Sequence, residues 1–185
     1  MGLLAKWKNR KPAKSQQGIT WKKNSWKRKT TIFYAGDEIG YFQMKGWLSY
    51  GGQGSLLNRP FFVRSKNIWQ TRFAFIDGVN DEVIATIRMN PWSYRTRLFL
   101  GDEVFIFKNN FWGNGTWWWQ RENGDATTQN EKLIHTHLTN LLTGKGQFEF
   151  GNTKESNLNA LILSGIFIAT LKEEISASVA ALAAG

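Results

Sequence analysis

The feature that most constrains the fold is an almost uninterrupted apolar stretch near the C-terminus, residues 158–171. Its few polar residues are Asn159, Ser164 and Thr170. Glu155-Ser156-Asn157 supplies an N-cap before it, which favours a helix. A bilayer-spanning helix needs about 20 apolar residues, and Lys172 ends this stretch earlier. A helix that is apolar on all sides must be enclosed, so a buried core helix is predicted. A membrane-inserted segment and a strand remain as alternatives.

Short apolar segments separated by turn sequences precede this helix. Two of them, around residues 31–44 and 98–107, share the form apolar segment, Gly-Asp-Glu, apolar segment, which is typical of a hairpin. Further strands are expected at 61–64, 68–76, 83–89, 95–100, 104–108, 116–121, 133–142 and 147–150. Closely spaced strands without helical periodicity predict an antiparallel β structure, either a sandwich or a barrel.

The basic charge of the chain is concentrated at its N-terminus. The formal net charge is +10, and residues 1–29 contain eight lysines, two arginines and no acidic residue. The remaining 14 basic residues balance the 14 acidic ones. We therefore predict a flexible, Trp-containing basic arm over residues 1–29, a single β domain over 30–175, and an Ala-rich tail over 176–185.

The composition of the arm suggests a partner with negative charge. Cations near an anionic lipid surface are attracted to it, and tryptophan favours the headgroup level. The candidate residues for binding an anionic membrane lipid, or another polyanion, are Lys22, Lys23, Lys27, Arg28, Lys29, Trp21 and Trp26. The same residue types suit single-stranded nucleic acid, through phosphate contacts and base stacking. A barrel that carries a small apolar ligand is a third hypothesis, although the ligand would compete with the helix for the interior.

The run Trp117-Trp118-Trp119 raises the question of which indoles face water. Side chains alternate along a strand, so Trp117 and Trp119 share one face and Trp118 takes the other. We expect Trp118 to point inward. Trp117 and Trp119 would then be partly exposed and form, with Trp112, a candidate aromatic patch. The opposite parity is the alternative.

Chemistry-bearing residues do not form a catalytic constellation in the sequence. His135 and His137 would share a face of a strand, but no acidic residue lies within three positions of the pair and cysteine is absent. They are therefore expected to be surface histidines rather than metal ligands. Asp37-Glu38 and Asp102-Glu103 are interpreted as turn residues. We predict a protein that is not an enzyme and that carries no metal or other cofactor.

The combination of many short strands with the apolar helix at 158–171 resembles the tubby C-terminal-like superfamily, which includes tubby domains, phospholipid scramblases and LURP-one-related proteins. The resemblance covers roughly residues 31–171 and lies in the pattern, without a phosphoinositide-binding or metal-binding motif. It implies a mainly β fold with one C-terminal helix, specifically a closed antiparallel β-barrel around a buried hydrophobic helix. It also implies a non-enzymatic binding or membrane-tethering module. A cytoplasmic location, with peripheral association at the membrane, is expected.

Overall fold

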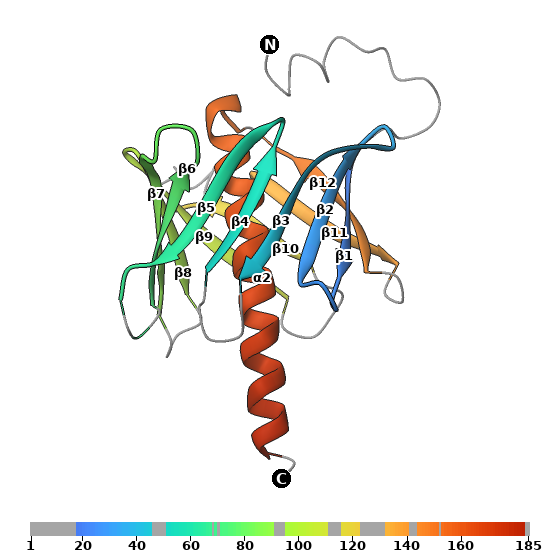
Figure 1. Ribbon diagram of the computed structural model, residues 1–185, viewed down its shortest axis with the longest axis vertical. Coiled ribbons are helices and arrows are strands. Elements are labelled where there is room, and N and C mark those ends of the chain that lie inside the picture. Colours follow the sequence, from blue (N-terminus) through green and yellow to red (C-terminus); the bar gives the residue numbers. More distant parts are fainter. Residues whose placement is uncertain are drawn as a thin grey trace.

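A computed structural model describes residues 18–45, 51–67, 69, 71–90, 95–110, 116–122, 132–140, 144–151 and 153–183. These residues form a closed barrel of antiparallel strands wrapped around one helix (Figure 1). The predicted architecture, a closed antiparallel β-barrel around a helix, is therefore confirmed.

The barrel follows the chain in a simple meander, with each strand hydrogen-bonded to the next and β1 closing the ring against β12. The strands are β1 (Ile19–Asn24), β2 (Lys29–Tyr34), β3 (Asp37–Lys45), β4 (Gly51–Leu56), β5 (Arg59–Ser65), β6 (Arg72–Asp77), β7 (Val83–Met89), β8 (Thr96–Leu100), β9 (Glu103–Asn109), β10 (Trp117–Arg121), β11 (Ile134–Asn140) and β12 (Lys145–Phe150). Closure leaves no open edge in the sheet that the described strands form, and along most of these strands alternate side chains point into the interior.

The helix, α2 (Glu155–Ala183), runs through the barrel and emerges beyond the strand ends (Figure 1). Its apolar stretch is enclosed, with Leu161, Phe167 and Ile168 fully buried. The ring of Phe167 makes edge-on contacts with Phe42 and Phe73, at centroid distances of 5.9 and 5.0 Å. The prediction of a buried core helix is confirmed, and the strand alternative is wrong.

The expected orientation of the tryptophan run is wrong, and the opposite parity holds. Trp117 and Trp119 are buried, whereas Trp118 lies on the outer wall and is partly exposed. The indole Nε1 of Trp119 donates a hydrogen bond of 2.8 Å to the backbone carbonyl of Leu161 on α2. A Cβ added at Gly165 would lie 2.2 Å from the ring of Trp117, so a residue without a side chain allows this close approach. The paired indoles are packing residues that seat the helix.

The predicted boundary between arm and domain at residue 29 is also wrong. Residues 19–24 form β1, which pairs with both β2 and β12 and completes the barrel. Trp21 packs against the core, next to Gly146. Residues 1–17 of the predicted arm lie outside the described residues, as does Trp112. At the other end of the chain, α2 continues without a break through residue 183, so most of the predicted tail is helical.

Candidate functional site: the exit end of the barrel

The antiparallel meander divides the strand connections between the two ends of the barrel. We call the end where α2 begins the entry end, and the end where α2 leaves the exit end. The connections from β1 to β2, β3 to β4, β5 to β6, β7 to β8, β9 to β10 and β11 to β12 all belong to the exit end. In Figure 1 this end is the lower one, from which the C-terminal half of α2 projects.

Large apolar side chains are exposed at the exit end. Trp26, in the β1–β2 turn, is 96% exposed, and Trp69, between β5 and β6, is 80% exposed. The projecting part of α2 adds Ile175, Val179 and Leu182, which are also exposed. Their spacing of four and three residues places these three side chains on one face of the helix. Two indoles and one aliphatic helix face are thus accessible at the same end of the molecule.

Basic side chains surround these apolar groups. The exposed cations near the exit ends of the strands are Lys22, Lys27, Lys45, Lys66, Arg72, Arg88, Arg95, Lys108 and Lys145. In the described part of the chain, the acidic residues at this end are Glu173 and Glu174, and both are engaged in ion pairs. The exit end therefore carries a positive electrostatic potential.

Three of the predicted anion-binding residues have partners within the protein. Lys23 forms an ion pair with Glu173 of α2. The guanidinium of Arg28 donates two hydrogen bonds to the carboxylate of Glu174, of 2.7 and 2.6 Å. These contacts fasten the β1–β2 hairpin to α2 where the helix leaves the barrel.

Lys29 is the third of these residues. Its ammonium lies 3.7 Å from a carboxylate oxygen of Glu38 and 4.5 Å from the centre of the Tyr41 ring. Of the predicted set, Lys22, Lys27 and Trp26 remain exposed to solvent, whereas Trp21 packs against the core. The expectation that all seven residues belong to a flexible arm is wrong, because residues 19–24 form a strand of the barrel.

Trp69 and the aliphatic face of α2 were missed by the sequence analysis. Trp69 lies within a segment interpreted as a strand, and Val179 lies within a tail interpreted by its alanine content alone. The spacing of Ile175, Val179 and Leu182 was a signal for a helical face that sequence analysis could have used. Sequence alone could not place that face at the same end as Trp26, because this depends on the direction of α2.

Lys172 marks the mouth of the barrel, where α2 passes from its enclosed to its exposed half. Burial lowers the pKa of its ammonium to about 8. The ammonium lies 5.0 Å from the centre of the Phe107 ring and 3.4 Å from Oδ1 of Asn109. A cation–π contact and a neutral amide oxygen offset only part of the lost hydration.

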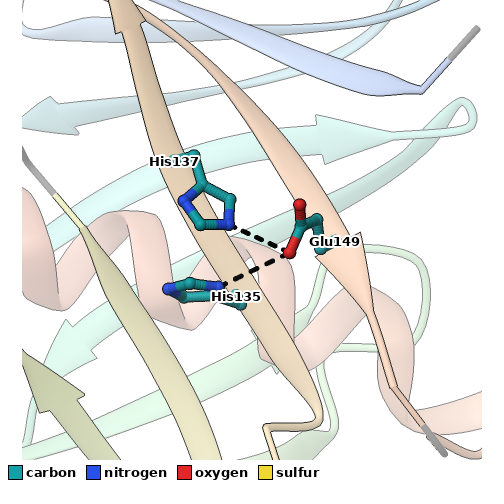
Figure 2. Close-up of side chains that lie close together, drawn as sticks. All are labelled: His135, His137 and Glu149. Carbon is teal, nitrogen blue, oxygen red and sulfur yellow. Dashed lines mark ion pairs between the residues drawn. The ribbon is translucent and has the colours of Figure 1, made fainter. Parts of the chain in front are cut away.

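A separate group of polar side chains lies on the outer wall, on β11 and β12 (Figure 2). In the pairing of these strands, His135 lies opposite Glu149 and His137 lies opposite Gln147. One oxygen of Glu149 is 2.9 Å from Nε2 of His137 and 3.6 Å from Nδ1 of His135. The antiparallel pairing therefore brings an acidic residue to two histidines that have no acidic neighbour in sequence.

The titration of this cluster reflects its position on a partly covered wall. Burial lowers the pKa of His135, and the charges of His137 and Lys132 lower it further against the opposing effect of Glu149. The hydrogen bond from His137 holds the pKa of the Glu149 carboxyl below its ordinary value. The expectation that the two histidines lack a third ligand-type neighbour is wrong, since Glu149 supplies one.

The interpretation of the adjacent carboxylate pairs as turn residues holds only for Asp102, which lies in the β8–β9 turn. Asp37 and Glu38 are the first two residues of β3, directly after the β2–β3 turn, and Glu103 is the first residue of β9. Both turns lie at the entry end. Glu103 has a structural role there, because it accepts a hydrogen bond of 2.6 Å from Asn157 in the first turn of α2.

Comparisons with protein-family models, with curated proteins and with solved structures find no match to this chain. Within the described residues, no helix has the length and apolar character needed to cross a bilayer.

Proposed function

We propose that this protein is a non-enzymatic membrane-docking module that sets the exit end of its barrel on an anionic lipid surface. The observation that carries the proposal is the coincidence of exposed indoles, an exposed aliphatic helix face and a ring of cations at one end of the molecule. The protein would associate peripherally with the membrane, and the barrel would act as a rigid body that presents this end.

Each component matches one property of a lipid interface. The indoles of Trp26 and Trp69 suit the headgroup level, where an aromatic ring can be partly buried. The face formed by Ile175, Val179 and Leu182 suits the boundary between headgroups and acyl chains. Each nearby lysine or arginine adds about 1 kcal/mol of attraction to an anionic surface. Apolar insertion and charge attraction therefore act in the same direction.

Aliphatic side chains favour lipid over single-stranded nucleic acid as the partner. Nucleic-acid binding uses cations for phosphates and aromatic rings for base stacking, and Trp26 and Trp69 would suit both partners. The three aliphatic side chains on α2 have no corresponding role in phosphate or base contacts. The hypothesis of an apolar-ligand carrier is weaker, because α2 fills the interior that such a ligand would need.

The relationship to the tubby C-terminal-like superfamily is part of this proposal. A barrel built around a hydrophobic C-terminal helix is the fold which that resemblance implies, and its members are linked to membrane lipid. In this chain the helix continues beyond the barrel as an exposed segment, so the docking surface we propose is built on residues 172–183 as well as on the strand connections.

Vesicle cosedimentation tests the proposal, using the full chain with phosphatidylcholine vesicles and with vesicles that also contain phosphatidylserine. We expect binding to the anionic vesicles that weakens with salt. Replacing both exposed indoles, in the double variant W26A/W69A, should weaken it on the order of 30-fold. This follows if each indole recovers about half of the 1.5–3 kcal/mol that full burial of a large apolar side chain provides.

The matched control is V79A, because Val79 is an exposed apolar residue at the entry end. This variant should bind as tightly as the unmodified protein. Equal losses in V79A and W26A/W69A would contradict the assignment of the docking surface. Binding to single-stranded oligonucleotide that depends on Trp26 and Trp69, without binding to vesicles, would favour the nucleic-acid hypothesis instead.

A further inference from the structure

We propose that His135, His137 and Glu149 form a binding site for a divalent transition-metal ion, with zinc the best match. The site lies on the outer wall of the barrel, over β11 and β12, and is independent of the docking surface at the exit end.

The distances between the candidate ligand atoms suit a single small ion. One ligand atom from each side chain can be chosen so that all three lie within 4.8 Å of one another. Zinc bonds to histidine nitrogen and carboxylate oxygen are about 2.0–2.2 Å long, so tetrahedral ligands are separated by roughly 3.3–3.6 Å. The two nitrogen–oxygen separations in the cluster, 2.9 and 3.6 Å, fall on either side of this range. Small rotations of the side chains would complete the geometry.

The backbone fixes the relative positions of the three ligands. His135 and His137 are two residues apart on β11, so they point to the same side of the sheet, and their ring centres are 4.0 Å apart. Regular pairing with β12 holds Glu149 directly across from His135. A site built on two hydrogen-bonded strands is more precise than one built on loops.

The surroundings orient one ligand and leave the other two accessible. The ring of Trp118, from the adjacent β10, packs edge-on against His135 at a centroid distance of 5.9 Å. The side chains of His137 and Glu149 are 44% and 61% exposed, so an ion can enter from solvent. Two imidazoles and one carboxylate form a three-ligand set that leaves a fourth position for water or another donor.

One nearby charge opposes cation binding. The ammonium of Lys132 lies 4.9 Å from the centre of the Trp118 ring, on the same part of the wall. Glu149 is the acidic residue that faces the two histidines, and it also serves as their hydrogen-bond partner when no ion is bound. We therefore expect moderate affinity, with a dissociation constant in the micromolar range, rather than the tight binding of a structural zinc site.

Cobalt titration of the full, untagged chain tests the site directly. Tetrahedral Co²⁺ with nitrogen and oxygen ligands absorbs visible light, and the chain contains two histidines and no cysteine. Visible absorption that saturates at one Co²⁺ per chain, and that Zn²⁺ abolishes by displacement, is the expected result. Zn²⁺ should also raise the Tm of the protein, because the ion binds the folded state.

Two single variants test the ligands, and a third serves as the control. H137A and E149Q should weaken Zn²⁺ binding at least tenfold in calorimetry, and both positions are exposed enough for the barrel to fold, which circular dichroism will check. E82Q, at an exposed acidic residue of the entry end, should bind like the unmodified protein. The proposal is overturned if the unmodified chain fails to bind Zn²⁺ or Co²⁺ at about 100 µM, a concentration well above the expected micromolar dissociation constant. It is equally overturned if H137A and E149Q bind as tightly as E82Q.

Discussion

The two ends of the barrel differ in the balance of their charges although the same strands join them. The entry end mixes the basic residues Arg59, Arg121, Lys132 and Lys154 with the acidic residues Asp37, Glu38, Asp77, Asp81, Glu82, Asp102, Glu103 and Glu122. The exit end carries exposed lysines and arginines together with Trp26 and Trp69. Because interior packing is continuous along α2, the difference between the ends arises in the strand connections, where packing imposes few limits on residue type.

The two ends also differ in the largest apolar side chains that they expose. At the entry end the exposed large apolar residues among those described are aliphatic, namely Leu57, Val79 and Val83. The exit-end β1–β2 turn presents a fully exposed indole instead. An exposed tryptophan contributes little to the stability of an isolated barrel, so its presence at one end favours a role in binding.

Among the variants that distinguish the two ends, neutralising lysines at the exit end should reduce the affinity for anionic vesicles most. We expect the quadruple variant K22Q/K27Q/K45Q/K66Q to bind anionic vesicles about a thousandfold more weakly, because four cations contribute about 4 kcal/mol at such a surface. Vesicle cosedimentation at low salt measures the change.

A matching change of charge at the entry end tests whether vesicle binding depends on where the charge lies or on the net charge of the protein. The triple variant D37N/E82Q/D102N removes exposed acids and raises the net charge. If the exit end is the docking surface, its affinity should change by less than about threefold, because these groups lie more than a Debye length from the membrane. A large gain in affinity would mean that net charge, and not the exit end, governs binding.

A carboxylate holds α2 at each end of its enclosed part, and removing either carboxylate should lower the free energy of unfolding. Glu174 receives two hydrogen bonds from Arg28, and Glu103 receives one from Asn157 while pairing with Lys154 and Arg121. Hydrogen bonds to charged groups contribute about 1.5–3 kcal/mol. We therefore expect E174Q and E103Q each to lower the free energy of unfolding by about 1–3 kcal/mol in urea denaturation at pH 7.

The effect of Glu103 should depend on pH in a defined direction. Burial alone would raise its pKa, but the hydrogen bonds from Asn157 and Lys154 and the charges of Lys154 and Arg121 outweigh burial and lower it below 4.5. Its stabilising contribution is therefore complete above the unfolded pKa and is lost as the pH falls through the folded pKa. The difference between E103Q and the unmodified protein should shrink below about pH 4.5. A difference that stays constant down to pH 3 would contradict this account.

Two sequence patterns agree with the barrel that the structure shows. The short strands predicted a sandwich or a barrel, the apolar residues 158–171 predicted an enclosed helix, and a closed barrel around that helix is what the resemblance implied. The prediction of a flexible arm was wrong for residues 19–24, because it rested on their basic composition and not on the alternation of their side chains. The lysines of residues 19–29 suggested a flexible arm, yet Ile19, Trp21 and Lys23 alternate inward as β1 requires.

The sites depended on information that a single sequence does not contain. Glu149 meets His135 only through the register of β11 and β12, which turn geometry and packing decide. The inward orientation of Trp117 and Trp119 depends on Gly165, far away in the sequence, leaving room on α2 for the indoles. Alternation along β10 showed that the indoles divide between two faces, but the choice of face is a tertiary effect.

The smallest predicted effect concerns Lys172, at the mouth of the exit end. Because its pKa is lowered to about 8, the folded chain binds fewer protons than the unfolded chain between about pH 8 and 10.5. Stability should therefore rise with pH across this window, and the cost of holding a charged lysine here is greatest below pH 8. Replacing the ammonium by an apolar group of similar length, in K172M, should raise the Tm at pH 7 by a few degrees, on the order expected for a domain of this size.

The advantage of K172M should disappear as the pH rises. Thermal unfolding followed by circular dichroism at pH 7, 8.5 and 10 would measure it, with K108M as the control at an exposed lysine of the same end. A Tm difference that does not change with pH would show that K172M acts through packing rather than charge. A Tm difference that shrinks to zero at pH 10 would show that the charge of Lys172, held at the mouth of the barrel, is what costs stability.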